Sequence, residues 1–590
     1  MDIKNMISEL FNCSLPQNIT EIAYNGVYVK YDGESAVIGG NTIPAKCRAY
    51  TLLAKEISEG KKSFEISEKP SLKTLGAMID MSRGGVMRAE SVKTYIKYLA
   101  AHGYNMLMLY TEDTYEVKDY PYLGYQRGRY TVEELRGIDD FAAELGVEVI
   151  PCIQTLGHME QFLRYSVNDE IADNAKVLLV GEEKTYTFIE SCIATMRSAF
   201  RTNRIHIGCD ETAGLGLGQY LVKNGMRDRF EIFSEHLGRV TELCKKYGFR
   251  PMMWSDMYFS LVEKSKEEDY MPHVVVPQYA IDAMPDADMV FWDYYHTNNE
   301  FYKINIEKHK NFNRPVVFGG GIWTWDGFVP NYDHTYNTMK PAMEEVLRGG
   351  VPEVIVTIWS NDGCETSHML ALPQLSLFSE YCWKGEGCTK DDIWSMSRFT
   401  TGMTEELSHA ISDFFFREDG AIRAGKHILW SDPLINLLCF DFDLPAAKKY
   451  LTDAIAVIEK YEDTEYILAA FRACLDKCEI HLNLRNRYKA GDKEYLRSFA
   501  ENKLPEIIAD FEKLHTLHRE MWYRDYKAHG FENIMCRYGA AIERLRHTGR
   551  VINDYLDGKI SEIEELEPEL ITGQKCKWLS ANDFMYIHTM

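Results

Sequence analysis

Two adjacent carboxylates, Asp210 and Glu211, follow a short apolar run, residues 204–208. Acid/base chemistry near neutral pH requires such a pair, in which one carboxylate stays ionised and the other is pushed towards protonation. Neighbouring side chains of an extended strand point in opposite directions, so the pair shares a pocket only if the backbone turns after the strand. The alternative interpretation is a helix N-cap, where such residues are common. Taken alone, the dipeptide favours the N-cap, so the decision rests on the other strand ends.

The elements that must position this pair form a repeated pattern of a short β-branched run, a loop and an amphipathic helix. Helical stretches between the runs are followed by glycines at positions 103, 146, 248 and 349, which are typical helix stops. Eight such units predict an α/β fold, a closed parallel (β/α)₈ TIM barrel over residues 71–394, with its active site at the carboxyl ends of the strands. The predicted strands are Leu75–Ile79, Asn105–Tyr110, Val147–Ile153, Arg204–Gly208, Arg250–Trp254, Met289–Trp292, Pro315–Gly319 and Glu353–Trp359.

Polar and aromatic residues gather at these predicted strand ends. Indole faces pack against the apolar faces of sugar rings, while arginine and carboxylates hydrogen-bond sugar hydroxyls. Packing at the barrel rim is the alternative for any single tryptophan. Together with the acidic pair, the set favours a carbohydrate pocket. In chain order its members are Arg83, Glu112, Asp113, His158, Trp254, Trp292, Tyr294, Tyr295, Trp323, Trp325, Trp359, Asn361 and Asp362.

The predicted barrel is flanked by two other regions. Residues 1–70 mix apolar runs with a helical segment and predict a small α/β domain, whereas residues 395–590 show only helical periodicity and predict an all-α domain. The helical region carries Trp522, Tyr523, Tyr526 and Phe531, large apolar groups that the barrel or a second subunit must cover. Because twofold homodimers are the commonest closed assembly, a homodimer is expected.

Composition excludes several classes of protein. The 590 residues carry 89 acidic and 66 basic side chains, a formal charge of −23, which disfavours nucleic acid and anionic membranes as partners. The sequence shows neither a signal peptide nor an apolar stretch long enough to cross a membrane. Fourteen cysteines without a CxxC pair indicate reduced thiols, not disulfides or a zinc site. We therefore expect a cytoplasmic protein without a metal or other cofactor.

At the fourth strand, His206-Ile207-Gly208-Cys209-Asp210-Glu211 resembles the His-x-Gly-Gly-Asp-Glu signature of glycoside hydrolase family 20, the β-N-acetylhexosaminidases. The segment 76–83, ending in Arg83, resembles the family's first-strand arginine motif. Val149-Ile150-Pro151 and Leu156-Gly157-His158 are similar to its Val-Ile-Pro and Pro-Gly-His segments. The resemblance covers about residues 71–385, and the helical third is similar to that of a cytoplasmic bacterial exo-N-acetylglucosaminidase subgroup. Cys209, Leu156 and the second strand, residues 106–110, depart from the family pattern.

The resemblance implies a retaining exo-glycosidase in which the substrate's own 2-acetamido oxygen is the nucleophile, through an oxazolinium intermediate. Glu211 would be the general acid and base, and Asp210 would orient the acetamido N–H and stabilise the intermediate. Tyr295, or as second choice Tyr294, would hydrogen-bond the acetamido oxygen. By the same resemblance, Trp254, Trp323 and Trp359 would wall the acetamido methyl, Arg83 would bind the C3 and C4 hydroxyls, Asn361 or Asp362 would bind those at C4 and C6, and His158 would support the acidic residues.

Three other functions remain open at this point. A metal-dependent barrel hydrolase would usually carry a His-x-His pair on its first strand, which Ala77-Met78-Ile79-Asp80 lacks. A non-catalytic sugar-binding barrel would keep the tryptophans and lose the acid, but Glu211 is present. A retaining β-glycosidase with its own carboxylate nucleophile would need a second catalytic carboxylate on another strand. The sequence decides neither between GlcNAc and GalNAc nor the linkage cleaved.

Overall fold

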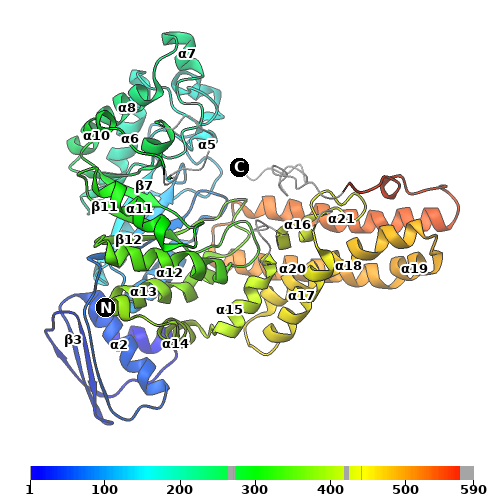
Figure 1. The fold of residues 1–590 in the computed structure, drawn as a ribbon, viewed down its shortest axis with the longest axis horizontal. Coiled ribbons are helices and arrows are strands. Elements are labelled where there is room, and N and C mark those ends of the chain that lie inside the picture. The colour runs from blue at the N-terminus through cyan, green and yellow to red at the C-terminus, as the bar shows by residue number, and fades with distance from the viewer. Residues whose placement is uncertain (1, 263–269, 271–272, 417–423, 440–441, 572–590) are drawn as a thin grey trace.

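The computed structural model describes residues 2–262, 270, 273–416, 424–439 and 442–571. At its centre eight parallel strands close into a barrel, in the order β10-β11-β12-β5-β6-β7-β8-β9 (Figure 1). The predicted barrel is confirmed, and each predicted strand is present within two residues at either end. The strands are β5 Thr74–Asp80, β6 Met106–Thr111, β7 Glu148–Ile153, β8 Arg204–His206, β9 Arg250–Trp254, β10 Asp288–Trp292, β11 Val316–Gly321 and β12 Glu353–Ile358.

Long helices that alternate with the strands cover the outside of the barrel, and the short helices α5, α7, α9 and α10 lie in the loops that follow strands. Thr131 and Glu134 form a reciprocal capping box that begins α4, and left-handed glycines follow several helices, among them Gly103 and Gly146. After α12 the left-handed residue is Gly350 and not Gly349. The helices are α3 Ala89–Ala101, α4 Val132–Glu144, α5 Glu160–Leu163, α6 Glu183–Ala199, α7 Gln219–Asn224, α8 Arg229–Lys246, α9 Asp256–Ser260, α10 Gln278–Asp282, α11 Asn299–Lys310, α12 Tyr332–Arg348 and α13 Leu375–Lys384.

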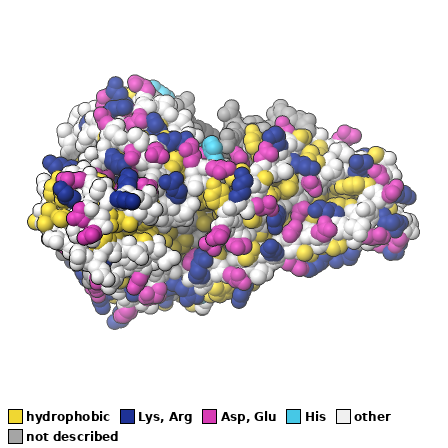
Figure 2. Space-filling model, turned by 90° about the horizontal axis from the view of Figure 1, so that it is seen from below, with side chains coloured by type: hydrophobic (Ala, Val, Ile, Leu, Met, Phe, Trp, Pro, Cys, Tyr) yellow, Lys and Arg dark blue, Asp and Glu magenta, His cyan; other side chains and the backbone are white. Residues whose placement is uncertain are grey.

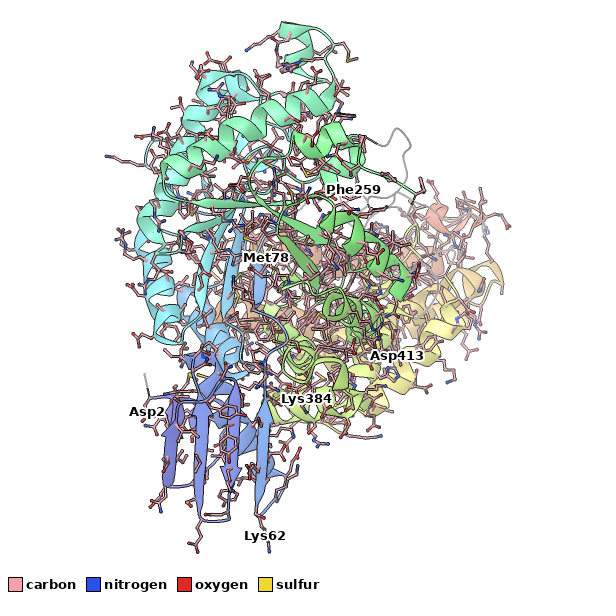
Figure 3. All side chains as sticks on the ribbon, turned by 60° about the vertical axis from the view of Figure 1, so that its left-hand side comes forward. Asp2, Lys62, Met78, Phe259, Lys384 and Asp413 are labelled. Carbon is pink, nitrogen blue, oxygen red and sulfur yellow. The ribbon has the colours of Figure 1, made fainter. Side chains whose placement is uncertain are left out.

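A small α/β unit precedes the barrel. Its four strands pair in the order β1-β3-β2-β4 and pack on α2, and Figure 3 shows this sheet at the opposite end of the barrel from Phe259, which belongs to α9 beyond the carboxyl end of β9. The unit therefore lies away from the catalytic end of the barrel. Its elements are α1 Ile3–Leu10, β1 Asn18–Ile22, β2 Val27–Tyr31, β3 Ser35–Gly40, α2 Ile43–Ser58 and β4 Phe64–Glu68.

A buried ion triad joins this unit to the barrel. Arg48 of α2 is fully buried and pairs with Glu68 at 2.7 Å and with Glu380 of α13 at 2.9 Å. Removing one partner of such a group leaves a buried charge without its counter-charge. We expect Arg48→Met to lower the free energy of unfolding by about 3–5 kcal/mol in urea titrations. The double variant Arg48→Met/Glu68→Gln should regain part of that loss, and a loss below about 1 kcal/mol in the single variant would contradict the role of the triad.

The last third of the chain is helical, as predicted, and extends sideways from the barrel (Figure 1). The side of the molecule seen in Figure 2 carries interspersed acidic and basic side chains over both parts. Within the described residues, none of the helices has the length and apolar character needed to cross a bilayer. The helices are α14 Lys390–Thr401, α15 Glu405–Ser412, α16 Ala424–Trp430, α17 Leu444–Ile458, α18 Glu465–Lys489, α19 Lys493–Ser498, α20 Leu504–Asp525 and α21 Phe531–Leu556.

Most of the large apolar groups of the helical region are covered within the chain, by one another and by the barrel. Trp522, Tyr526 and Phe531 are each 1% exposed, and the Tyr526 hydroxyl accepts a hydrogen bond from the His368 backbone N–H at 2.8 Å; only Tyr523 stays 39% exposed. These groups therefore give no argument for a second subunit. The expected boundary at residue 394/395 falls inside α14, which packs against α13, so we propose that the barrel unit extends to Thr401.

Candidate active site

The acidic pair shares one site because the backbone turns sharply after β8. Gly208, Cys209 and Glu211 all have positive φ, of 69°, 68° and 45°. A side chain at position 208 would place its Cβ 2.1 Å from Gln154 Oε1, so this position requires glycine. The next helix, α7, begins only at Gln219, with Gly218 as its N-cap. The N-cap interpretation of Asp210 and Glu211 is therefore wrong.

Asp210 is held by two side chains from the loop after β7. Gln154 Nε2 donates to one carboxylate oxygen at 2.8 Å, and His158 Nε2 lies 3.1 Å from the other. Burial alone would raise the pKa of Asp210, but the charge and hydrogen bond of His158, together with Gln154, lower the pKa to about 2. Conversely, burial would lower the pKa of His158, but Asp210 raises it well above its ordinary value. The pair is therefore a carboxylate and an imidazolium at neutral pH.

Two connected hollows meet at Glu211. The inner pocket, of about 70 Å³, is lined by Asp210 and a group of aromatic residues, and the outer cleft, of about 1110 Å³, by residues of several strand-end loops. Arg83, Glu211 and Asn361 line both, whereas Asp210 lines only the inner pocket. In a ligand that spans both hollows, the bond that joins the part in the inner pocket to the part in the outer cleft would thus lie beside Glu211. The Glu211 side chain is 57% exposed.

Four tryptophans wall the inner pocket, and they are not the predicted three. Trp254 and Trp359 line it as predicted, but Trp323 does not. Trp323 stacks behind Trp325, with ring centroids 3.9 Å apart, and Trp325 takes the place in the wall. Trp292 completes the set. In the sequence, Trp292 and Trp325 look like the predicted residues, because each is a tryptophan at a strand end. The path of the backbone beyond the strand decides which indole faces the pocket.

Of the two candidate tyrosines, Tyr294 is the better placed, although both line the inner pocket. Tyr294 is 7% exposed, and its hydroxyl accepts a hydrogen bond from Trp359 Nε1 at 3.0 Å. Burial, Tyr295 and the nearby Asp210 and Glu211 raise its pKa well above its ordinary value, so the phenol stays protonated and can donate. Tyr295 is 48% exposed. This geometry favours Tyr294 over Tyr295, the first choice that the family resemblance gave.

Arg83 lies between two aromatic rings and two carboxylates at the pocket mouth. Its guanidinium is 5.1 Å from the ring centroids of both Tyr110 and Trp359. It also pairs with Asp80 and with Glu112, each at 3.2 Å. Of the two carboxylates after β6, Glu112 is therefore the one that contacts Arg83. Asp113, which follows it, turns away to pair with Arg127 at 2.9 Å.

The two polar residues after β12 occupy different places. Asn361 lines both hollows, whereas Asp362 lines only the outer cleft and pairs with Lys426 of α16 at 3.3 Å.

Sequence reasoning missed Gln154 and Tyr110. They extend the hydrogen-bond network around Asp210, because Gln154 Nε2 also donates to the Tyr110 hydroxyl at 3.0 Å. Their only sequence signal is their position at the ends of β7 and β6.

One triad of donor atoms has the spacing of a metal site. Atoms of His158, Asp210 and Glu211 all lie within 4.8 Å of one another. Metal binding requires a neutral imidazole, whereas the raised pKa of His158 keeps its ring protonated. The triad is therefore better suited to hold a proton between His158 and Asp210 than to hold a cation.

The protonation of His158 predicts a pH dependence of stability. Its folded pKa is raised, so the folded state retains a proton that the unfolded chain loses near pH 6.5. The stability from this pair is therefore full below pH 6.5 and is lost as the pH rises towards the folded pKa, by at most about 1.4 kcal/mol per pH unit. In urea titrations, we expect the advantage of wild type over His158→Gln to shrink between pH 6.5 and 8.5. An advantage that grows with pH would contradict the assignment.

A barrel with an acidic pair at a strand end, in a pocket walled by tryptophans, has the architecture of a glycoside hydrolase. Residues 75–386 match the model described as the glycosyl hydrolase family 20 catalytic domain, and residues 417–580 match the glycoside hydrolase 20C C-terminal domain. The chain belongs to glycoside hydrolase family 20.

Individual relatives are distant. The chain is 25% identical to the Entamoeba histolytica beta-hexosaminidase subunit beta over 47% of its own length and 60% of that protein. It is 25% identical to bovine hexosaminidase D over 33% of its length and 55% of that protein, and 28% identical to Arabidopsis thaliana beta-hexosaminidase 1 over 61% and 64%. The chain thus spans just over half the length of the first two relatives. The solved GH20 beta-N-acetylhexosaminidase from Streptomyces coelicolor shares the fold, with a TM-score of 0.50 at 16% identity over 68% of this chain and 90% of that one.

Proposed function

We propose that the protein is an exo-acting, retaining glycosidase that releases terminal non-reducing β-linked N-acetylhexosamine, GlcNAc and possibly GalNAc, by substrate-assisted catalysis. The terminal sugar occupies the inner pocket and the rest of the substrate occupies the outer cleft. The observation that carries this proposal is the division of labour between the carboxylates. Asp210 lies inside the sugar pocket, ionised and paired with His158, whereas Glu211 lies where the two hollows meet.

In this mechanism Glu211 protonates the glycosidic oxygen and then deprotonates the attacking water. Asp210 accepts the acetamido N–H and stabilises the positive charge of the oxazolinium intermediate. The Tyr294 hydroxyl donates to the acetamido oxygen, a role that the sequence assigned first to Tyr295. Trp254, Trp292, Trp325 and Trp359 enclose the acetamido methyl group and exclude water from the intermediate.

The remaining polar residues bind the hydroxyls of the terminal sugar. Arg83 is fixed by Asp80 and Glu112 and would bind those at C3 and C4. Asn361, which reaches the inner pocket, is better placed than Asp362 to bind those at C4 and C6. His158 acts from behind Asp210 by holding its charge and orientation.

The test is hydrolysis of an aryl N-acetyl-β-glucosaminide in the presence of a chelator, compared with the plain aryl β-glucoside. Substrate assistance requires the 2-acetamido group, so the first should be cleaved and the second should not. Equal rates on both would favour a β-glycosidase with its own nucleophile, and loss of activity in chelator would favour a metal site at His158, Asp210 and Glu211. An inert protein that still binds N-acetylglucosamine would be a sugar-binding barrel.

Two further parts of the proposal concern the whole molecule. We infer a cytoplasmic location, since the thirteen cysteines in the described part of the chain form no disulfide with one another and disulfides are rare in the cytoplasm. We propose a homodimer, because twofold homodimers are the commonest closed assembly. Light scattering on the full chain tests the homodimer, and the mass of a monomer would refute it.

A further inference from the structure

The loop after β12, residues 359–367, links the sugar site to the helical region. It contributes Trp359 and Asn361 to the inner pocket and Asp362 to the outer cleft. The barrel holds its start, because Ser360 N–H donates to Asp80 Oδ2 at 3.1 Å. The barrel also holds its end, since Thr366 Oγ1 donates to the Gly327 carbonyl at 2.8 Å.

The middle of this loop has an unfavourable backbone. Asp362, Gly363 and Cys364 have φ angles of 65°, 101° and 58°, so two residues other than glycine adopt left-handed conformations in a row of three. Such residues persist only where the surrounding structure fixes them. The loop therefore needs contacts that hold its middle as firmly as its ends.

Those contacts come from the helical region, through two buried cations. Lys426 of α16 is 1% exposed and pairs with Glu365 at 2.7 Å and with Asp362 at 3.3 Å. Arg537 of α21 is fully buried, donates to the Asp362 carbonyl at 3.0 Å and pairs with Glu365. Trp430 Nε1 donates to Glu365 at 2.9 Å. The boundary is thus crossed by one network of five side chains, Asp362 and Glu365 from the loop and Lys426, Trp430 and Arg537 from the helical region.

The network contains a stable ionised centre. Burial alone would raise the pKa of Glu365, but the charges and hydrogen bonds of Lys426 and Arg537 outweigh burial and lower it. Glu365 lines neither hollow, so it acts on the site only through the backbone of its own loop. Tyr466 of α18 adds a third helix, because its hydroxyl donates to the Glu365 carbonyl at 3.2 Å.

We propose that Lys426 and Arg537 are positioning residues, through which the helical region sets how the enzyme binds the C4 and C6 hydroxyls of the terminal sugar. This inference rests on the proposed function, because that function gives those hydroxyls to Asn361 of this loop in preference to Asp362. The two cations touch no substrate atom and act by fixing the 359–367 loop.

The test compares three substrates: the aryl N-acetyl-β-glucosaminide and its 4-deoxy and 6-deoxy analogues. Lys426→Met should lower kcat/KM on the parent by about tenfold or more, mainly through KM, because the loop no longer presents its hydrogen-bonding groups. On an analogue that lacks the hydroxyl bound by the loop, Lys426→Met should lower kcat/KM by less than about threefold. Lys426→Arg, which keeps the charge, should restore the wild-type pattern.

The matched control is Lys477→Met, since Lys477 of α18 is also 1% exposed in the helical region but donates to the Ser431 carbonyl. This variant should change all three substrates by one common factor. If Lys426→Met also lowers all three equally, the cation has only a structural role and the proposal is overturned. Should Lys426→Met not fold, Glu365→Gln replaces it, because glutamine keeps the shape of the side chain but lacks the charge that pairs with both cations.

Hydrogen–deuterium exchange separates this proposal from the proposed function. Amides of residues 360–366 should exchange at least about tenfold faster in Glu365→Gln than in wild type, whereas Lys477→Met should leave them unchanged. This readout requires no catalysis. If the amides of the 359–367 loop exchange at the wild-type rate in Glu365→Gln, the helical region does not fix this loop and the proposal is overturned. This conclusion holds whether or not the wild-type protein cleaves the glycoside.

Discussion

Replacing Glu211 by glutamine is expected to lower kcat/KM on a natural disaccharide by about 10² or more, the usual contribution of general acid catalysis. Glutamine fills the same space at the junction of the two hollows but cannot give a proton to the leaving oxygen. The loss should therefore grow with the pKa of the leaving group. On aryl substrates with acidic phenols, formation of the intermediate should be nearly normal, and breakdown should become limiting because the base is missing.

A series of aryl N-acetyl-β-glucosaminides with graded phenol pKa values measures this dependence. Glu160→Gln is the matched control, because Glu160 lines the outer cleft but not the inner pocket. We expect the control to change the rates by less than about threefold, without dependence on the leaving group. If Glu211→Gln hydrolyses the disaccharide at nearly the wild-type rate, Glu211 is not the general acid.

Asp210→Asn is expected to reduce kcat by about 10²–10³ on all these substrates, including the most activated ones. Its charge stabilises the oxazolinium whatever the leaving group is, so the slope against phenol pKa should stay as in wild type. Asparagine keeps the size of the side chain and a possible hydrogen bond from Gln154 but loses the charge that faces His158. The pKa of His158 should fall in this variant, because Asp210 is the main group that raises it.

Single-turnover rates and a histidine NMR titration check the two halves of this prediction. Asp113→Asn is the control, since Asp113 is a buried carboxylate at the same end of the barrel that pairs with Arg127 and lines neither hollow. A loss confined to substrates with poor leaving groups would show that Asp210 assists proton transfer instead. Equal losses in the control would indicate a general effect of removing a buried charge.

Local sequence patterns were sufficient to predict the barrel. Its strands are short and buried on both faces, so they read as nearly continuous apolar runs, and helix stops such as Gly103 and Gly146 separate the units. The acidic pair was identified for the same reason, because the carboxyl ends of the strands are where a barrel gathers its chemistry. Residues one or two positions beyond a strand end are therefore assigned to the site by topology alone.

Which neighbour faces the pocket was beyond local patterns. Trp323 and Trp325 have the same residue type and nearly the same position, and the backbone beyond the strand decides which of them lines the pocket. Tyr294 and Tyr295 both line the pocket, but Tyr294 is 7% exposed and Tyr295 is 48% exposed. After β8 the turn depends on successive left-handed residues, including Cys209, which no propensity predicts.

The sequence by itself determined the barrel, the helical last third and the acidic pair, because apolar periodicity and strand order are properties of short segments. Only the tertiary structure decided that Trp325 and not Trp323 walls the pocket and that Glu112 and not Asp113 pairs with Arg83. It also brought Arg537 to Glu365, a residue 172 positions away in the chain. The physical reason is that a buried cation is stable only beside its counter-charge, and which carboxylate that is depends on how α16 and α21 dock on the barrel.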